Sequence, residues 1–348
     1  MSENQKPAPT ILLTGASGVV GQAVLARMTE HTVVCLTHNT PVPGHRTVRV
    51  RGDLTRPFFG LDRSSYQELA DRIDVVVHCA AVTGFSIDAE QTHELNVRGT
   101  ENVLAFARQA QAPLQHVSTA FVARRDLAVA GYGSARPEVY LDSKRVAEQA
   151  VLASGVPVNI VRPSVVIGNS VTGRISQFQG LHTIAGALLK NTLPMLPLEP
   201  ASRIDFVPQD LVADVIAHLV RTGTTGGEYW VTGGRAAPTA GRIVELGLAL
   251  GRSLGLSPDT PRFVSHDMVD RLIRPVFIDA LPRAQRRRFD DMLAMTALFN
   301  AVEPFPSTYG HVPGVTPFSA QNLEDAFTAS MRHYAQAKRL VRPSEVAA

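Results

Sequence analysis

Apolar and polar residues alternate along the first half of the chain in blocks of two kinds. Short apolar runs of strand length are followed by longer segments in which apolar residues recur every three or four positions, which is helical spacing. Strands that alternate with helices predict a parallel sheet with helices on both faces. The predicted strands cover residues 11–13, 32–37, 47–51, 74–79, 114–122 and 158–162, and the predicted helices cover 64–71, 88–110 and 138–153, after a first helix that ends near residue 30.

The regular alternation ends after residue 162. The pattern then predicts helices at 177–190, 209–221 and 319–341, a proline-rich loop at 193–200, strands at 203–207 and 228–233, and helix-rich apolar sequence over 261–305. We therefore expect an α/β protein, with a doubly wound parallel sheet and a smaller, mostly helical C-terminal substrate or cap domain. The expected division places 8–165 and the returning segment 203–233 in the sheet domain, and 166–202 and 234–348 in the cap.

The composition of the 348 residues is that of an ordinary globular protein. Charged residues make up 19% and hydrophobic residues 45%, so neither disorder nor a fibrous repeat is indicated. The formal net charge is only +3. Basic residues are scattered except for one cluster, which Asp290 and Asp291 follow at once and in which no aromatic residues are interleaved. We interpret this cluster as a solvated helix face and predict no nucleic-acid binding; it consists of Arg283, Arg286, Arg287 and Arg288.

The two cysteines and the chain start bear on the compartment. Cys35 and Cys79 each lie in an apolar strand-like run, where thiols are usually buried and unreactive. A central strand is expected to separate them, so we predict no disulfide and a reducing compartment. The first ten residues are polar, and no later apolar run approaches membrane-span length. We therefore expect a cytoplasmic protein.

The stretch TILLTGASGVVGQAVLARMTE near the N-terminus combines a buried-strand run, a glycine turn and an amphipathic helix. Gly15 permits the tight turn, Gly18 leaves room for a pyrophosphate, and Gly21 lets the helix pack closely on its strand. The free N–H groups from Ser17 to Val20 are expected to face the anion. Because the strand and helix supply the context that this motif requires, we predict a Rossmann dinucleotide-binding site.

The end of the second strand bears on the choice of cofactor. An Asp or Glu about 20 residues after the glycine turn would bind the ribose 2′-hydroxyl of NAD. The sequence reads Thr-His-Asn there, which favours NADP(H) and leaves NAD(H) open. His38 and Arg46 are candidates for the 2′-phosphate contact. Asp53, after the third strand, is either a turn cap or a cofactor contact.

Further along, Ala80 and Ala81 follow the apolar run DVVVHC. Small residues at the carboxyl end of a central strand leave room for a cofactor. Ser118 and Thr119 lie at the exit of the strand at 114–122, and hydroxyls there are common turn formers. Asn96 lies inside the predicted helix 88–110, where an exposed polar residue is the simpler interpretation.

Tyr140 and Lys144 lie four residues apart in the helix at 138–153, so the phenol and the ammonium share one face. A phenol has an unperturbed pKa of about 10, and a nearby ammonium would lower it by stabilising the phenolate. Tyr140 would then donate a proton to a carbonyl oxygen as hydride reaches carbon, with Thr119 holding that oxygen. An isolated Y-x-x-x-K arises more often by chance, but the preceding glycine turn and hydroxyl-bearing strand favour the catalytic interpretation.

Six motifs in this order resemble the extended branch of the short-chain dehydrogenase/reductase superfamily, over roughly residues 10–235. They are TGASGVVG, DVVVHCAA, ELNVRGTENVL, HVSTAFV, YLDSK and IVRPSVVIG. Within the branch, HVSTAFV, the run 162–180 and IDFVPQDLVADVIAHL look most like thioester reductases and fatty acyl reductases.

The resemblance implies roles for individual residues, and no metal ligands. It makes Tyr140 the proton donor, Lys144 the residue that binds the nicotinamide ribose and tunes Tyr140, and Thr119 the residue that orients the substrate carbonyl. Similar thioester reductases usually carry Arg where this chain has His38. The implied cofactor-binding residues are Gly15, Ser17, Gly18, Val19, Val20, Gly21, His38, Asp53, Leu54, Ala80, Ala81, Val82, Asn96, Lys144, Pro163, Val165 and Val166.

Two functions remain open. The first is a stand-alone NADPH-dependent carbonyl reductase that acts on a ketone or aldehyde of a hydrophobic, polyketide-like secondary metabolite. The second is reduction of an acyl thioester carried on CoA or an acyl carrier protein, which the motifs favour although no adenylation or carrier domain is recognised. Apolar residues over 261–305, with Met292 and Met295 as candidate pocket residues, indicate a bulky hydrophobic substrate.

Two other functions are disfavoured. Sugar-nucleotide epimerases and dehydratases of this superfamily typically show a Tyr-Gly-Pro turn where this chain reads SVVIGNS. A non-catalytic NADP sensor would lack the pair Tyr140 and Lys144. The oligomeric state is left open.

Overall fold

The computed structural model describes residues 8–42, 47–124 and 135–341. Its centre is a seven-stranded, wholly parallel sheet in the order β10-β6-β5-β4-β1-β2-β3. Every residue of β1 and β4 is buried, as expected for parallel strands with helices on both faces. The strands are β1 (Ile11–Thr14), β2 (Val33–Thr37), β3 (Val48–Arg51), β4 (Val75–His78), β5 (Leu114–Val117), β6 (Val158–Pro163) and β10 (Glu228–Val231).

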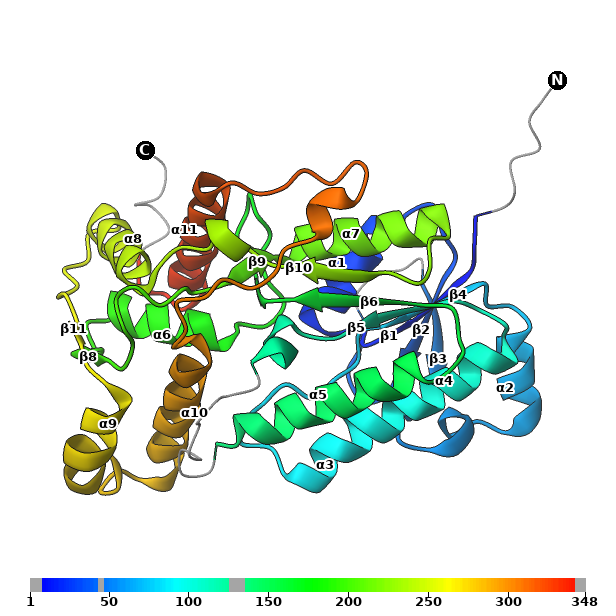
Figure 1. Ribbon diagram of the computed structural model, residues 1–348, viewed down its shortest axis with the longest axis horizontal. Helices are drawn as coiled ribbons and strands as arrows, with labels where there is room; N and C mark the ends of the chain where they lie inside the picture. Colours follow the sequence, from blue (N-terminus) through cyan, green and yellow to red (C-terminus); the bar gives the residue numbers. More distant parts are fainter. Residues whose placement is uncertain (1–7, 43–46, 125–134, 342–348) are drawn as a thin grey trace.

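Two layers of helices cover the sheet (Figure 1). On one face α1 (Val19–Arg27) packs against α7 (Gln209–Thr222), and their apolar residues share one core with the strands. The other face carries α2 (Arg63–Ala70), α4 (Gly99–Gln109) and α5 (Pro137–Leu152). The helix predicted at 88–110 is one continuous helical run, from α3 (Ala89–His93) through a π-helical segment (Glu94–Arg98) into α4.

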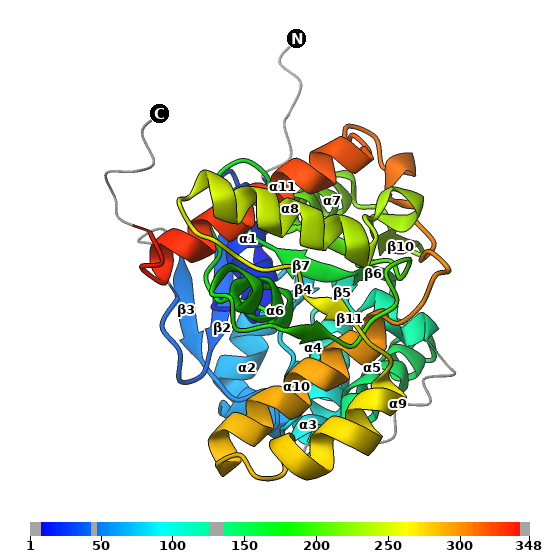
Figure 2. The ribbon, with the colours of Figure 1, turned by 90° about the vertical axis from the view of Figure 1, so that its left-hand side faces the viewer.

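In addition to these two layers, a mostly helical cap layer lies over one end of the sheet and has an apolar core of its own (Figure 2). Its long helices are α6 (Gly180–Leu189), α8 (Ala240–Ser253), α10 (Arg283–Phe299) and α11 (Ala320–Ala337). A short α9 (His266–Met268) continues into a π-helical segment (Val269–Ile278). Two small parallel pairs lie outside the main sheet: β7 (Val165–Ile167) with β9 (Phe206–Pro208), and β8 (Met195–Leu196) with β11 (Arg262–Phe263). Short 3-10 helices are Pro57–Gly60, Ala120–Ala123, Gly234–Ala236 and Tyr309–His311.

The fold class is confirmed, and the differences from prediction are local. The strand predicted at 114–122 ends at Val117, because Thr119 caps the 3-10 helix that follows. The helix predicted at 177–190 begins at Gly180, and the strand predicted at 203–207 covers Phe206–Pro208. The sequence pattern had predicted no element for α8. We propose the division at 165/166, 202/203 and 233/234, because β10 joins the main sheet beside β6 while α6 and α8 pack in the cap core.

The sheet also places the cysteines as expected. Cys35 lies on β2 and Cys79 follows β4, β1 lies between these strands, and both thiols are free. Among the described residues, no helix is both long and apolar enough to cross a membrane.

The sheet order identifies where a ligand should bind. Chain progression runs outward from β1 to β2 and β3, and then resumes on the other side of β1 with β4, β5 and β6. In open α/β sheets, ligands bind outside the carboxyl ends of the strands at this reversal point. The glycine turn after β1 and the Ala80 loop after β4 lie there.

Candidate active site

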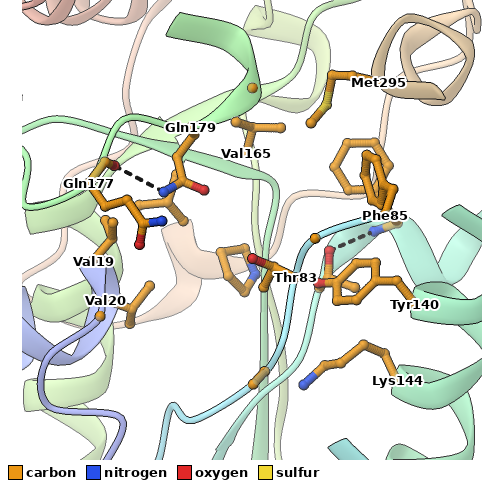
Figure 3. A pocket seen from close by; sticks show the side chains of 18 of the residues that line it. Val19, Val20, Thr83, Phe85, Tyr140, Lys144, Val165, Gln177, Gln179 and Met295 are labelled. Carbon is orange, nitrogen blue, oxygen red and sulfur yellow. Dashed lines mark hydrogen bonds between the residues drawn. The ribbon is translucent and has the colours of Figure 1, made fainter. Parts of the chain in front are cut away.

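A cavity of about 540 Å³ lies between the carboxyl ends of the strands and the cap. Figure 3 shows Val19 and Val20 from α1 on one side of it, and Tyr140 and Lys144 from α5 on the other. Eleven of the predicted site residues line this cavity: Gly18, Val19, Val20, Gly21, Ala81, Thr119, Tyr140, Lys144, Pro163, Val165 and Val166. The remaining predicted residues do not line it: Gly15, Ser17, His38, Asp53, Leu54, Ala80, Val82 and Asn96.

The glycine turn has no room for side chains at two of its positions. Gly15 has a φ of +71°, and a Cβ there would lie 2.5 Å from the backbone nitrogen of Ala80. A Cβ on Gly21 would lie 2.1 Å from the Gly15 carbonyl oxygen. A Cβ on Gly18 would meet only that same oxygen, at 3.3 Å, so the turn is open on the side of Gly18. The turn thus brings backbone close to the cavity, as the motif predicts.

The start of α1 fits an anionic group. No side chain caps this helix, and its first turn carries no acidic residue. The first N–H groups of a helix lack partners within it, and they attract anions. One correction applies to the predicted free amides: the Gly18 N–H already donates to the Gly15 carbonyl, at 2.9 Å. The amides of Val19 and Val20, which line the cavity, are the better candidates for a pyrophosphate.

Tyr140, Thr119 and Lys144 converge on one wall of the cavity. The Tyr140 hydroxyl is hydrogen-bonded to the Thr119 side chain. Lys144 is 3% exposed, and its Nζ donates to the Val117 carbonyl oxygen at 2.9 Å. Ser118, between these positions, has a buried hydroxyl without a partner among the described residues, and it also lines the cavity. The wall therefore offers the hydroxyls of Tyr140, Thr119 and Ser118 to a bound ligand.

The pKa values at this wall differ from the expectation. Burial raises the pKa of Tyr140 to about 12, against the opposing effect of its hydrogen bond with Thr119. Burial lowers the pKa of Lys144 to about 8, against the opposing charges of Glu148 and Cys79. The expected lowering of the Tyr140 pKa by Lys144 is therefore absent here, because burial dominates. Tyr140 is held in its protonated form, which is the form that donates a proton.

Asn96 is buried, contrary to the simpler interpretation of the sequence. It is 1% exposed and lies in the π-helical segment before α4. Its Oδ1 accepts from the Val82 N–H at 2.8 Å, and its Nδ2 donates to the Val82 carbonyl at 3.0 Å and to the Ser143 hydroxyl at 2.9 Å. Ser143 in turn donates to the Tyr140 carbonyl at 2.7 Å. Asn96 therefore joins the loop after β4 to the helix turn that carries Tyr140.

Behind Lys144 lies a buried ion pair. Glu148 is one turn further along α5, and Arg162 on β6 reaches it with Nη2 to Oε2 at 2.6 Å and with Nε at 3.0 Å. Both side chains are less than a tenth exposed. Arg162 also contacts Glu228 at 2.6 Å and lies over the Trp230 ring. Arg162 thus gives Glu148 a buried ion-pair partner directly behind Lys144.

The candidates for the adenosine end lie outside the cavity. The His38 side chain is 60% exposed, with its Nε2 3.9 Å from Oδ2 of Asp53. Asp53 also forms a turn cap, because its Oδ1 accepts from the N–H and the hydroxyl of Thr55. Leu54 is buried in the core beneath α4. Arg46 lies outside the described residues.

Sequence reasoning missed the residues that the cap and two loops bring to the cavity. The loop after β4 contributes five residues, the loop before α6 three, the start of α6 one and helix α10 four; they are Thr83, Gly84, Phe85, Ser86, Ile87, Gln177, Phe178, Gln179, Gly180, Arg287, Asp291, Met295 and Leu298. Only Met295 was predicted among them, on its apolar character. Met292, predicted with it, does not line the cavity, although both methionines pack against the cap core. The glycines at 84 and 180 were the sequence feature that could have indicated a close approach at the cavity. A Cβ on Gly180 would lie 2.5 Å from the Met295 methyl group.

The doubly wound sheet, the glycine turn and the ordered motifs define an NAD-binding oxidoreductase of the extended short-chain dehydrogenase/reductase type. The chain belongs to the Male sterility protein family, whose NAD-binding sequence model matches residues 42–216. Within the superfamily it lies in the thioester reductase branch.

Three similar proteins illustrate the relationship. Glycine betaine reductase ATRR of Emericella nidulans is 30% identical over 257 residues, which cover 61% of this chain and 20% of that protein. The terminal R domain from the myxalamid PKS-NRPS biosynthetic pathway has a TM-score of 0.74 at 23% identity, covering 97% of this chain and 93% of that one. A thiolation-reductase di-domain from an archaeal non-ribosomal peptide synthetase has a TM-score of 0.68 at 18% identity, covering 96% and 76%. The two structural likenesses show the fold, and the chain spans a fifth or less of the first curated relatives.

Proposed function

We propose that this protein reduces the thioester of a hydrophobic acyl chain with NADPH. The observation that carries the proposal is one continuous cavity. It runs from the glycine turn, past Thr119 and Tyr140, to the apolar side chains of Met295 and Leu298 in the cap. Such a cavity can receive the pyrophosphate and nicotinamide portions of a dinucleotide at one end and an acyl chain at the other.

The cofactor assignment rests on the fit of the chain's own groups. The open side of Gly18 and the uncapped start of α1 suit a pyrophosphate. Lys144 and Ser118 suit the hydroxyl groups of the nicotinamide ribose. A bound nicotinamide dinucleotide would supply hydride at this wall. We propose NADPH over NADH, because the chain places no carboxylate directly after β2.

The proposed chemistry uses three side chains. Thr119 and Tyr140 hold the thioester carbonyl oxygen by hydrogen bonds, which orients the carbonyl carbon for attack. The Tyr140 hydroxyl donates its proton to that oxygen as hydride reaches carbon, which gives a hemithioacetal. Collapse of the hemithioacetal releases the thiol and leaves an aldehyde. Lys144, with Glu148 behind it, supplies the positive charge that offsets the phenolate left on Tyr140.

The similar proteins favour this function over the ketone or aldehyde reduction that the sequence ranked first. The R domains among them belong by name to peptide and polyketide synthetases, and one structure joins a reductase to a thiolation domain. We therefore infer that the acyl group arrives on CoA or on a carrier protein, as part of secondary metabolism. We propose a cytoplasmic location on the same ground.

One assay separates the candidate functions. Consumption of NADPH, and then of NADH, is measured with one acyl chain presented as an acyl-CoA, an acyl-pantetheine thioester, the free aldehyde and a matched ketone. Turnover of the thioesters is the expected result, and Tyr140→Phe should abolish it while leaving NADPH binding intact. Turnover of the ketone and aldehyde alone would replace the proposal with a carbonyl reductase. An unchanged rate in Tyr140→Phe would remove Tyr140 from its role.

A further inference from the structure

The basic cluster on α10 lies at the mouth of the active-site cavity rather than on a plain solvated face. Arg287 and Asp291 line the cavity, and they also line an adjoining hollow together with Arg283, Ala284 and Arg288. The two spaces therefore share a wall. Arg287 and Asp291 thus lie between the active-site cavity and the hollow.

The carboxylates near this cluster neutralise it only in part, because one of the two faces away from it. Asp290 is 2% exposed and is bound by Arg274, whose Nη1 lies 3.0 Å from Oδ1. Asp291 accepts a hydrogen bond of 2.5 Å from the Ser86 hydroxyl. Within the part of the chain that the structure describes, Arg283 and Arg288 have no ion-pair or hydrogen-bond partner. The expectation that the two aspartates offset the cluster is wrong for Asp290, which faces inward.

Arg287 is partly committed to the protein. Its Nη2 donates to the Ser86 carbonyl oxygen at 3.0 Å, which ties α10 to the loop after β4 at the edge of the cavity. A guanidinium has five N–H donors in a planar fork, so most of its donors are still available to a ligand. The position of Arg287 is therefore fixed while its capacity to bind an anion is retained.

One face of α10 changes character along its length. Arg283, Arg287 and Asp291 follow one another at four-residue spacing, and Met295 and Leu298 continue the same face into the cavity. At a rise of about 1.5 Å per residue, Arg287 lies about 16 Å along the helix from Leu298, and Arg283 lies about 22 Å from it. The face thus offers apolar contacts at the inner end and cations at the outer end.

We propose that Arg283, Arg287 and Arg288 bind the phosphate of the 4′-phosphopantetheine arm that carries the acyl thioester. This inference rests on the proposed thioester reduction. The acyl chain lies beyond the thioester at one end of the pantetheine arm, and the phosphate lies at the other end, which matches the order of apolar and cationic groups along α10. Each arginine guanidinium can bind two phosphate oxygens at once. Three clustered arginines therefore suit one phosphate better than scattered lysines would.

Binding of the arm alone tests the site without any turnover. The protein loaded with NADPH is titrated calorimetrically with 4′-phosphopantetheine and with pantetheine, which lacks the phosphate. We expect the phosphorylated arm to bind about tenfold more tightly, and the double variant Arg283→Gln/Arg288→Gln to lose that preference. Arg286→Gln is the matched control, because Arg286 is half-buried on the same helix and lines neither space. Equal binding of the two arms by the native protein would overturn the proposal.

Kinetics separate this inference from the proposed function and identify the source of the arm. The kcat/KM is compared for one acyl group on pantetheine, on 4′-phosphopantetheine, on CoA and on an isolated acyl carrier protein. We expect the double variant to lose about tenfold on the three phosphate-bearing substrates and nothing on acyl-pantetheine. Equal losses on all four would overturn the phosphate site while leaving thioester reduction intact. Tight binding of the arm without thioester turnover would instead overturn the proposed function. A rate that is higher with the carrier protein than with CoA would identify the carrier as the source.

Discussion

Lys144 and Glu148 lie one helical turn apart on the buried side of α5, and the charge of Glu148 opposes the lowering that burial imposes on the Lys144 pKa. The same carboxylate is held by Arg162 through two hydrogen bonds of 3.1 Å or less from Nε and one of 2.6 Å from Nη2. The active-site ammonium is thus connected through Glu148 to β6. The electrostatics of the site therefore extend behind the cavity wall.

We predict that activity falls as pH rises through about 8, and that Glu148→Gln moves this loss to lower pH. Lys144 has a pKa of about 8 in the folded protein, so it is charged below that pH and neutral above it. Without the Glu148 carboxylate the ammonium loses its main electrostatic support, and the pKa drops by about one further unit. The measurement is kcat/KM for NADPH across pH 6 to 10, and it compares the pH at which half of the activity is lost in the variant and in the native protein.

Glu228→Gln is the matched control for this experiment. Glu228 contacts the same Arg162 at 2.6 Å, but its side chain is 50% exposed. Its removal should leave the alkaline limb in place. An identical limb in Glu148→Gln and in the native protein would show that Glu148 does not tune Lys144.

Lys144→Met should be inactive and yet more stable than the native protein at neutral pH. A pKa of about 8, against the ordinary lysine value of 10.5, means that folding destabilises the charged form by roughly 3 kcal/mol at pH below 8. The lysine's hydrogen bond to Val117 offsets about 1 kcal/mol of this. The expected gain in unfolding free energy is therefore about 1 to 2 kcal/mol.

The pH dependence of that gain fixes its cause. Between pH 8 and 10.5 the folded native protein releases the Lys144 proton while the unfolded chain keeps it, so native stability rises with pH in this window. The methionine variant has no such pH dependence, so the two stabilities should cross between about pH 9 and 9.5, and the native protein should be the more stable by about 1 kcal/mol near pH 10.5. Chemical denaturation at pH 7 and pH 10 measures the difference, with exposed Lys190→Met as a control that should change by less than about 0.5 kcal/mol. A methionine variant less stable than native at pH 7 would contradict the assignment.

Asn96→Ala should reduce both stability and turnover. Removal of its amide leaves the Val82 N–H and the Ser143 hydroxyl without their partner in a buried setting, which costs about 2 to 4 kcal/mol. The rate should fall more than tenfold, because Ser143 supports the helix turn of Tyr140. Asn102→Ala, on the same helix, loses one hydrogen bond to the Leu54 carbonyl and should cost about 1 kcal/mol without an effect on kcat. Equal effects of the two substitutions would mean that Asn96 only supports the fold.

The Asn96 network shows what the sequence could and could not predict. The strands β1 to β6 and the glycine turn were predicted because their signals are local: buried apolar runs and glycines at fixed spacing. Helix propensity treats Asn as mildly unfavourable and exposed, and it has no term for a π-helical turn that rotates one side chain inward. The need for an amide at position 96 is explained by its two hydrogen bonds to the backbone of Val82, which lies in a loop distant in sequence.

The cavity walls supplied by the cap were not predictable for a related reason. Ser86 and Asp291 are hydrogen-bonded across 205 residues of sequence, and neither has a distinctive local pattern. The arginines of α10 were recognised as a cluster, but their placement at a cavity mouth depends on how α10 packs against the loop after β4. Periodicity identifies which residues share a helix face, whereas tertiary packing decides what that face meets.

Cofactor preference offers a test at the end of β2. The His38 side chain is 60% exposed, and its imidazole lies 3.9 Å from the Asp53 carboxylate. His38→Arg adds a fork that pairs phosphate oxygens, and we expect it to raise the ratio of kcat/KM for NADPH over NADH about tenfold. Asn39→Arg adds the same charge one residue away and should change the ratio far less. If the two variants behave alike, general charge rather than position 38 governs the preference.

Met295 and Met292 lie three residues apart on α10 but have different surroundings. Both pack against the cap core, but only Met295 also lines the cavity, beside Gly180 at the start of α6. Met295→Gln should raise KM for a long-chain thioester about tenfold, because a polar amide replaces about 1 to 2 kcal/mol of apolar contact, and the Kd for NADPH should not change. Met292→Gln should lower the melting temperature and leave KM unchanged. The pair separates contact with substrate from support of the cap, since both substitutions introduce the same amide into the same helix. A KM that rises equally in both would mean that α10 acts through its packing and that the substrate chain lies elsewhere.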